Sequence, residues 1–156
     1  MRHYDNAPDF SSVLNFARFR PGLDTCGKLT APASGLVAEA GYKTVINLSE
    51  PHEDGVAAEQ EALLKQGVRY VNIGVTPASF CSAHVDQCAV ILNEPANAPI
   101  LFHCLSSNRV GAVLAVLHAR TGASVDEALA EGKRAGLKSD GMIAATRRVL
   151  DAELKK

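Results

Sequence analysis

The sequence of 156 residues lacks several features that would place it in a specialised class of protein. It has no run of about 18 apolar residues, which a membrane-spanning helix needs, and no internal repeat or low-complexity tract. It has no excess of charge of either sign, since 16 basic and 17 acidic residues give a net charge of -1 at pH 7. Bulk electrostatics therefore favour neither nucleic acid nor a membrane as a partner, and any bound anion must be held by a local site.

Cysteine is scarce and unclustered. The four cysteines, Cys26, Cys81, Cys88 and Cys104, do not show the close spacing of a small domain held together by disulfides. The first residues, Met-Arg-His-Tyr-Asp-Asn, are polar and lack the apolar run of a secretory signal. This favours the cytoplasm, with the periplasm as the alternative if a signal peptide has been removed.

Strand-like and helix-like segments alternate along the chain. Length and composition, with 47% hydrophobic and 21% charged residues, favour one globular domain over residues 1–156. Because strands that alternate with helices form parallel sheets, we expect an α/β fold with a mainly parallel central sheet flanked by helices. Strands are predicted at 16–20, 43–48, 69–75 and 99–103, and helices at 30–40, 56–66, 82–93 and 110–121, with Ser124 and Ser139 capping two more.

Residues 103–109, His-Cys-Leu-Ser-Ser-Asn-Arg, join the last predicted strand to the next helix. Ligands of parallel sheets bind at the carboxyl ends of the strands, where this turn lies. Amide groups of the turn and of the first helical turn lack helical partners, so they can converge on an anion. The positive electrostatic potential of these amide groups at the helix N-terminus also lowers the pKa of a thiol from about 8.5 to roughly 3.5–7.5. We therefore predict an anion-binding loop in which Cys104 is a thiolate nucleophile.

The other residues of the loop have types that suit an anion site. Arg109 offers a planar, permanently charged fork for two oxygens of the anion. His103, directly before the nucleophile, could donate a hydrogen bond or add positive charge. Amide groups and short side chains for holding the anion would come from Leu105, Ser106, Ser107, Asn108 and Val110.

Residues 102–111 resemble the phosphate-binding loop of cysteine-based protein phosphatases, whose signature is His-Cys, five residues and Arg. The sequence is more closely similar to a bacterial phosphatase-like family related to the beta-lactamase-hydrolase-like proteins, with a Cys-to-Arg gap one residue shorter. Residues 22–30, 41–48 and 69–75 resemble that family's first three strands, so the similarity spans about residues 13–135. The resemblance implies a dual-specificity-phosphatase fold and, without a cofactor, hydrolysis of a phosphate monoester through a thiophosphoryl-cysteine intermediate.

The loop departs from the phosphatase pattern in its length and in two residue types. Four residues separate Cys104 from Arg109, which is the gap typical of rhodanese-like sulfurtransferases. Ser107 stands where related loops have glycine, and Val110 stands where phosphatases have serine or threonine, so only Ser106 or Ser107 could help the thiolate leave. Two alternatives therefore stand beside the phosphatase: a sulfurtransferase that carries a persulfide on Cys104, and a non-catalytic oxyanion-binding module.

A general acid is absent from its expected place. Residues 76–81, Thr-Pro-Ala-Ser-Phe-Cys, follow the third of these strands and contain no carboxylate. The polar loop after the second strand offers Glu50, Glu53 and Asp54 as candidate acids. Loss of the acid would cost about 10²- to 10⁴-fold in rate but would spare substrates with good leaving groups. The sequence thus predicts a weak or specialised phosphatase.

The remaining cysteines suggest two further roles, metal binding and a reversible disulfide. Cys81, His84 and Cys88 are residue types that bind zinc, at a spacing that resembles a zinc site. Cys88, however, falls on an apolar helical face, so we expect it to pack in the core and predict no metal site. Cys81 follows a strand at the same sheet edge and could form a reversible disulfide with Cys104, with an inert thiol as the alternative. Neither the natural substrate nor the oligomeric state can be inferred from the sequence.

Overall fold

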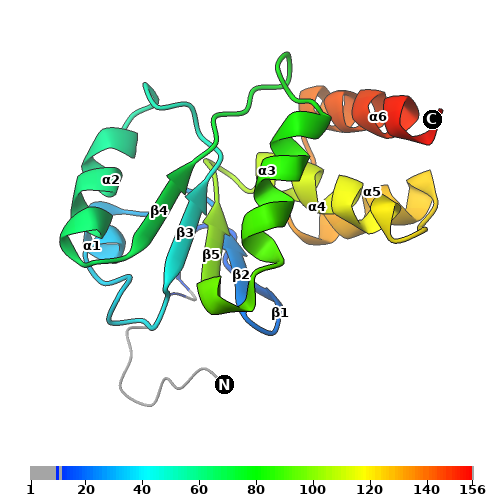
Figure 1. The fold of residues 1–156 in the computed structure, drawn as a ribbon. Helices are drawn as coiled ribbons and strands as arrows, with labels where there is room; N and C mark the ends of the chain where they lie inside the picture. The colour runs from blue at the N-terminus through cyan, green and yellow to red at the C-terminus, as the bar shows by residue number, and fades with distance from the viewer. Residues whose placement is uncertain (1–9, 11, 156) are drawn as a thin grey trace.

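The computed structural model describes residue 10 and residues 12–155. A central sheet has helices on both sides (Figure 1). The strands are β1 Ala17–Arg20, β2 Leu23–Cys26, β3 Thr44–Asn47, β4 Arg69–Asn72 and β5 Ile100–His103. The helices are α1 Ala31–Ser34, α2 Val56–Lys65, α3 Ser82–Leu92, α4 Asn108–Arg120, α5 Val125–Arg134 and α6 Asp140–Leu154, with a 3-10 helix, η1 Pro95–Asn97, before β5.

The strand order is β1-β2-β5-β3-β4, and β1 alone runs antiparallel to its neighbour. The central strand β5 pairs with both β2 and β3, so that His103 lies beside Cys26 on one side and Asn47 on the other. The carboxyl ends of four parallel strands therefore meet at one edge, where the segment after His103 emerges. The expected α/β fold with a mainly parallel sheet is confirmed.

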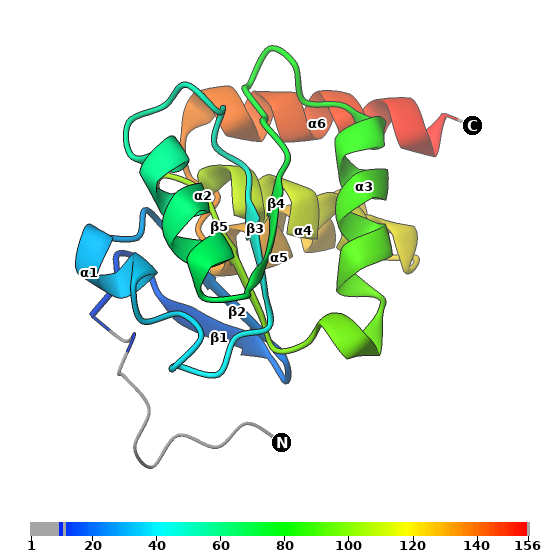
Figure 2. The same ribbon diagram turned by 60° about the vertical axis from the view of Figure 1, so that its left-hand side comes forward.

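Alternate residues of the strands feed two hydrophobic cores, one on each face of the sheet. Leu101 of β5 packs with Val37 and Leu63 on the side of α1 and α2. Phe102 of the same strand packs with Val113 on the opposite side, which α3 to α6 cover. Figure 2 shows the two helical layers on either side of the strands. This two-sided arrangement explains why every residue of β2, β3 and β5 is buried.

Helix α4 is buried around almost its whole circumference, since eight of its residues from Val110 to Ala119 are buried. It packs closely on α5: a Cβ on Gly111 would come within 2.5 Å of Gly132 O, and one on Gly132 within 2.7 Å of Gly111 O. Only glycines permit this approach of two helix backbones. The loop before α4 therefore starts from a helix that is held firmly in place.

Three predicted elements differ from the observed ones. The helix expected over 30–40 ends at Ser34, because the N–H of Leu36 bonds to Ala33 O, three residues back, instead of continuing the four-residue pattern, and the chain continues in turns. Cys81, not Ser82, is the N-cap of α3, and Ser82 Oγ instead donates to Glu153 at 2.6 Å. Helix α4 begins at Asn108 rather than at Val110, which places Arg109 in its first turn.

Among the described residues, no helix is both long and apolar enough to span a bilayer. The predicted caps of the last two helices are confirmed: Ser124 forms a capping box with Glu127, and Ser139 Oγ accepts from Met142 N. These caps fix the starts of α5 and α6, the two helices packed on α4.

We predict that Gly111→Ala destabilises the protein by about 2 kcal/mol, since the added methyl group overpacks the α4–α5 contact. Gly141→Ala is the matched control, because a Cβ there would meet nothing closer than 4.0 Å and alanine favours helix. Urea denaturation monitored by circular dichroism measures both changes. Equal stability of the two variants would contradict the close packing described here.

Candidate active site

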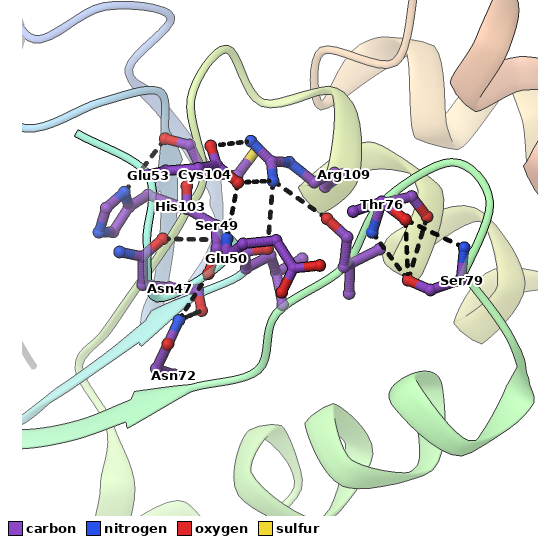
Figure 3. Close-up of polar contacts among 12 residues, drawn as sticks. Asn47, Ser49, Glu50, Glu53, Asn72, Thr76, Ser79, His103, Cys104 and Arg109 are labelled. Carbon is purple, nitrogen blue, oxygen red and sulfur yellow. Dashed lines mark hydrogen bonds and ion pairs between the residues drawn. The ribbon is translucent and has the colours of Figure 1, made fainter.

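The segment after β5 places Cys104 at the carboxyl edge of the sheet, directly before the loop that leads into α4 (Figure 3). Cys104 is buried, with 1% of its surface exposed. Its sulfur is therefore surrounded by protein and has almost no contact with bulk solvent. The loop residues that follow range from the exposed Leu105 to the fully buried Ser107.

Hydrogen bonds from the β2 side support the loop. The backbone N–H of Lys28 donates to Leu105 O at 2.8 Å, and Asn15 Nδ2 donates to Ser106 O at 2.9 Å. Gly27 allows the two segments to approach, since a Cβ there would lie 2.7 Å from Leu105 O. The carbonyl groups of Leu105 and Ser106 are therefore held by residues that flank β1 and β2.

The other side of the loop is held by the connection between α5 and α6. Asn108 Oδ1 accepts from the backbone N–H groups of Lys138 and Ser139, each at 2.8 Å. Ser107 has φ of 71°, the left-handed region where the sequence comparison expected glycine, so the serine accepts the strain. Its buried Oγ lacks a hydrogen-bond partner among the described residues. The turn thus takes a glycine-like conformation without glycine.

Arg109 is fixed by a bidentate ion pair with Glu53. Nη1 donates to Glu53 Oε2 at 2.7 Å and Nη2 donates to Oε1 at 3.0 Å. Nη1 also donates to Val75 O at 3.0 Å and lies 3.5 Å from Leu48 O. Carbonyl groups of the segments after β3 and β4 therefore both contact the guanidinium. The Nε edge of the guanidinium donates to no carbonyl or carboxylate among the described residues. Nε and the second Nη2 hydrogen can therefore serve an anion beside Cys104.

The ion pair also fixes the charge of both partners. The hydrogen bond from Arg109 lowers the pKa of Glu53, against the opposing effect of burial. Burial lowers the pKa of Arg109, but the bond to Glu53 and the interaction with Cys104 outweigh it, so that the pKa is raised. Glu53 is therefore a carboxylate that orients Arg109, a role that differs from the acid expected of it.

The other two predicted acids, Asp54 and Glu50, have different surroundings. Asp54 is exposed and pairs with Lys28, with Oδ2 3.0 Å from Nζ. The Glu50 carboxylate occupies the space beside Gly74 and points away from Cys104 (Figure 3). The turn after β4, where an acid was expected and the sequence has none, is closed by hydrogen bonds between Thr76 and Ser79. None of the three predicted acids therefore turns an unpaired carboxylate toward Cys104.

His103 belongs to a buried polar network beneath the loop. Its Nδ1 lies 3.2 Å from Cys104 O, and because a carbonyl only accepts, Nδ1 carries the hydrogen. Its Nε2 lies 2.7 Å from Glu59 Oε2, and Asn47 Nδ2 donates to the same Oε2 at 3.2 Å. Glu59, in the first turn of α2, was missed by sequence reasoning because it lies 44 residues from His103.

The remaining cysteines have different surroundings. Cys81 is exposed at the start of α3, with its Sγ 3.7 Å from His84 Nδ1. Its pairing with Cys104 stays a prediction. Cys26 is fully buried, and burial together with the charge of Cys104 raises the pKa of its thiol well above the usual value. Cys88 lies in the core, where burial raises its pKa to about 12. Residues 10 and 12–155 contain no cluster of three or more residues suited to a metal ion.

No protein-family model matches the sequence, and no curated protein matches it significantly. Solved structures do match. The core catalytic domain of the PP-IP phosphatase Siw14 from S. cerevisiae, in complex with citrate, has 18% identity and a TM-score of 0.70, over 92% of this chain and 90% of its own. A cysteine-to-serine variant of TpbA from P. aeruginosa, in complex with pTyr, has 22% identity and a TM-score of 0.64, over 92% and 86%. A DUF442 protein from Shewanella putrefaciens CN-32 has 19% identity and a TM-score of 0.70, over 92% and 95%.

The chain has the protein tyrosine and dual-specificity phosphatase fold. This confirms the fold that the sequence resemblance implied. The link to the beta-lactamase-hydrolase-like proteins stays a prediction, as do the roles of the individual loop residues.

We predict that Glu53→Gln lowers kcat/KM by about 10- to 100-fold, because Arg109 loses its bidentate anchor and the anion site loses its geometry. The loss falls equally on p-nitrophenyl phosphate and phenyl phosphate, two substrates that differ in leaving-group acidity. A loss confined to phenyl phosphate would instead identify Glu53 as the general acid.

The same variant tests the ion pair through acid denaturation. Because the pKa of Glu53 is lowered in the folded protein, the pair stabilises it above the unfolded pKa of about 4.3, and this contribution is lost as pH falls through the folded value. Unfolding free energies across that acidic range should therefore fall less steeply in Glu53→Gln than in the wild type. Parallel curves would argue against the ion pair.

Ser107→Gly should stabilise the protein by about 0.5–1 kcal/mol, since glycine relieves the left-handed φ and removes the unpaired hydroxyl. Ser107→Ala is the control, because alanine removes the hydroxyl and keeps the strain. Thermal unfolding compares them, and the observation of a lower midpoint for glycine than for alanine would refute the strain.

Proposed function

We propose that this chain is a cysteine-dependent phosphatase that hydrolyses a phosphate monoester. The observation that carries the proposal is the pairing of Cys104 with Arg109 at the carboxyl ends of the strands, with the Nε edge of the arginine bonded to no carbonyl or carboxylate of the described residues. The names of the similar structures add support, because Siw14 is a phosphatase by name and TpbA was captured with pTyr. Phosphate or another oxyanion is then the ligand of the loop, and no cofactor is needed.

The chemistry follows from the positions of the two residues. The thiolate of Cys104 attacks phosphorus, the P–O bond to the leaving group breaks, and the leaving oxygen takes the bonding electrons. Loop amides and Arg109 neutralise the charge on the three equatorial oxygens of the transferred phosphoryl group. Water then attacks phosphorus, inorganic phosphate departs, and the thiolate is restored. His103 acts through the backbone, because its Nδ1–H holds the Cys104 carbonyl.

The leaving group determines how fast the first step can be. Glu53 is held by Arg109 and Glu50 points away, so protonation of the departing oxygen by these two carboxylates is not supported. Asp54 is 98% exposed beside Lys28, and no contact places its carboxylate against Cys104 among the described residues. Without an acid the first step slows by about 10²- to 10⁴-fold for poor leaving groups. The proposed enzyme is therefore specialised for esters of acidic alcohols, phenols or similar good leaving groups.

Sulfur transfer is the second candidate, and the gap of four residues between Cys104 and Arg109 favours it. In that reaction the Cys104 thiolate would attack the outer sulfur of thiosulfate, the S–S bond of the donor would break, and sulfite would leave while Cys104 keeps the persulfide. Arg109 would bind the donor. The third interpretation, an oxyanion-binding module without turnover, uses the same two residues for recognition only.

We expect wild-type protein to hydrolyse p-nitrophenyl phosphate and Cys104→Ser to lose this activity, since a hydroxyl is a far weaker nucleophile here than a thiolate. Parallel assays of thiosulfate–cyanide sulfurtransferase activity should show no transfer by either protein. Phosphatase activity that is equal in both proteins would sink the proposal, and sulfur transfer that depends on Cys104 would replace it.

A further inference from the structure

Two cavities beside the loop share a wall. The smaller, of about 200 Å³, is lined by Cys104, and the larger, of about 500 Å³, lies between α1 and α2. Lys28, Leu29, Gly55 and Glu59 line both of them. The two cavities therefore adjoin, and together they extend from the nucleophile into a space as large as those that hold small-molecule ligands.

Lys28 lies at the junction of these cavities. Its backbone is tied to the loop through the bond to Leu105 O at 2.8 Å. Its side chain extends to the start of α2, where Nζ would lie 3.7 Å from a Cβ on Gly55 and is 3.0 Å from Asp54 Oδ2. The backbone of Lys28 is therefore held beside the anion loop, and its ammonium group lies at the start of α2.

The ion pair that holds Lys28 is weak. The Asp54 side chain is 98% exposed and that of Lys28 is 43% exposed, and ion pairs in such positions contribute little to stability. A bound anionic group can displace Asp54 from Lys28 at small cost. By contrast, Glu53 and Glu59, the other acids of the smaller cavity, are engaged by Arg109 and His103.

Among the described residues that line the two cavities, Lys28 is the one side chain with a permanent positive charge. The larger cavity continues past it between residues with small side chains, which leave space for the body of a ligand: Ala31 and Ser34 of α1, and Ala58 and Ala62 of α2. A ligand that fills this space from Cys104 outward must pass the ammonium group.

We propose that Lys28 is a specificity-determining residue that binds a second anionic group, carried on the leaving group of the substrate. The preferred substrate is then a phosphate monoester whose leaving group bears a carboxylate or a phosphate. This inference rests on the proposed phosphatase function, in which Cys104 and Arg109 hold the transferred phosphoryl group.

The test compares 4-carboxyphenyl phosphate with its uncharged analogue 4-carbamoylphenyl phosphate, using the full chain and measuring phosphate release. The readout is the ratio of the two kcat/KM values, so effects common to both substrates cancel. We expect Lys28→Met to lower this ratio about fivefold, Lys28→Arg to keep it, and Asp54→Asn to raise it. Hydroquinone bisphosphate as a third substrate shows whether phosphate or carboxylate is preferred.

An unchanged ratio in Lys28→Met, or an equal loss on both substrates, overturns the proposal, because Lys28 then contacts no group that distinguishes them. Failure of the phosphatase function itself is seen separately, as absent turnover of both compounds by wild-type protein. In that event, calorimetric binding of the two compounds to Cys104→Ser protein, with and without Lys28→Met, decides the question. Lys28 must strengthen binding of the carboxylate over the amide, and equal effects on both would reject the inference.

Discussion

The ion pair between Arg109 and Glu53 is the interaction on which the candidate site depends. It joins the first turn of α4 to the loop after β3, and the carbonyl of Val75 adds the end of β4 to the same guanidinium. Arg109 is therefore preoriented before any ligand arrives. Because two faces of its fork are occupied by protein, one edge is left, and the direction from which an anion can approach is fixed.

This use of Glu53 separates binding from chemistry. A carboxylate that orients the arginine is ionised and cannot also protonate a leaving group, and its pKa is lowered for that reason. In the proposed phosphatase, Glu53 therefore serves recognition of the oxyanion, and the rate depends on the leaving group. Among the described residues that line the adjoining cavities, Lys28 has the one permanent positive charge.

The sequence predicted the parts of the molecule that depend on local pattern. Apolar runs gave the parallel strands, and the order of strand, Cys104, polar turn and Arg109 placed the loop at the correct sheet edge. The helix expected over 30–40 was wrong because the backbone turns after Gly35, where the N–H of Leu36 bonds to Ala33 O, and apolar spacing does not reveal such a turn. Glu53 lies 56 residues from Arg109, so the sequence alone could not show that these two residues form an ion pair.

The same reason explains what was missed beneath the loop. Sequence spacing marked His103 as a donor of a hydrogen bond or of charge, but its pairing with Glu59 depends on α2 packing against the sheet. A single acidic residue in the first turn of a helix is also common, because it interacts favourably with the helix dipole, so its presence does not indicate a further role. Positions fixed by the sheet register were predictable, whereas side-chain pairs between distant elements were not.

In the proposed reaction, Cys104 carries the phosphoryl group during turnover. Rapid quenching of the wild-type protein with an excess of p-nitrophenyl phosphate, followed by mass spectrometry of the peptide that contains Cys104, tests this step. We expect a peptide heavier by one phosphoryl group, absent in Cys104→Ser. Steady turnover with no such adduct, or an adduct on another residue, would contradict it.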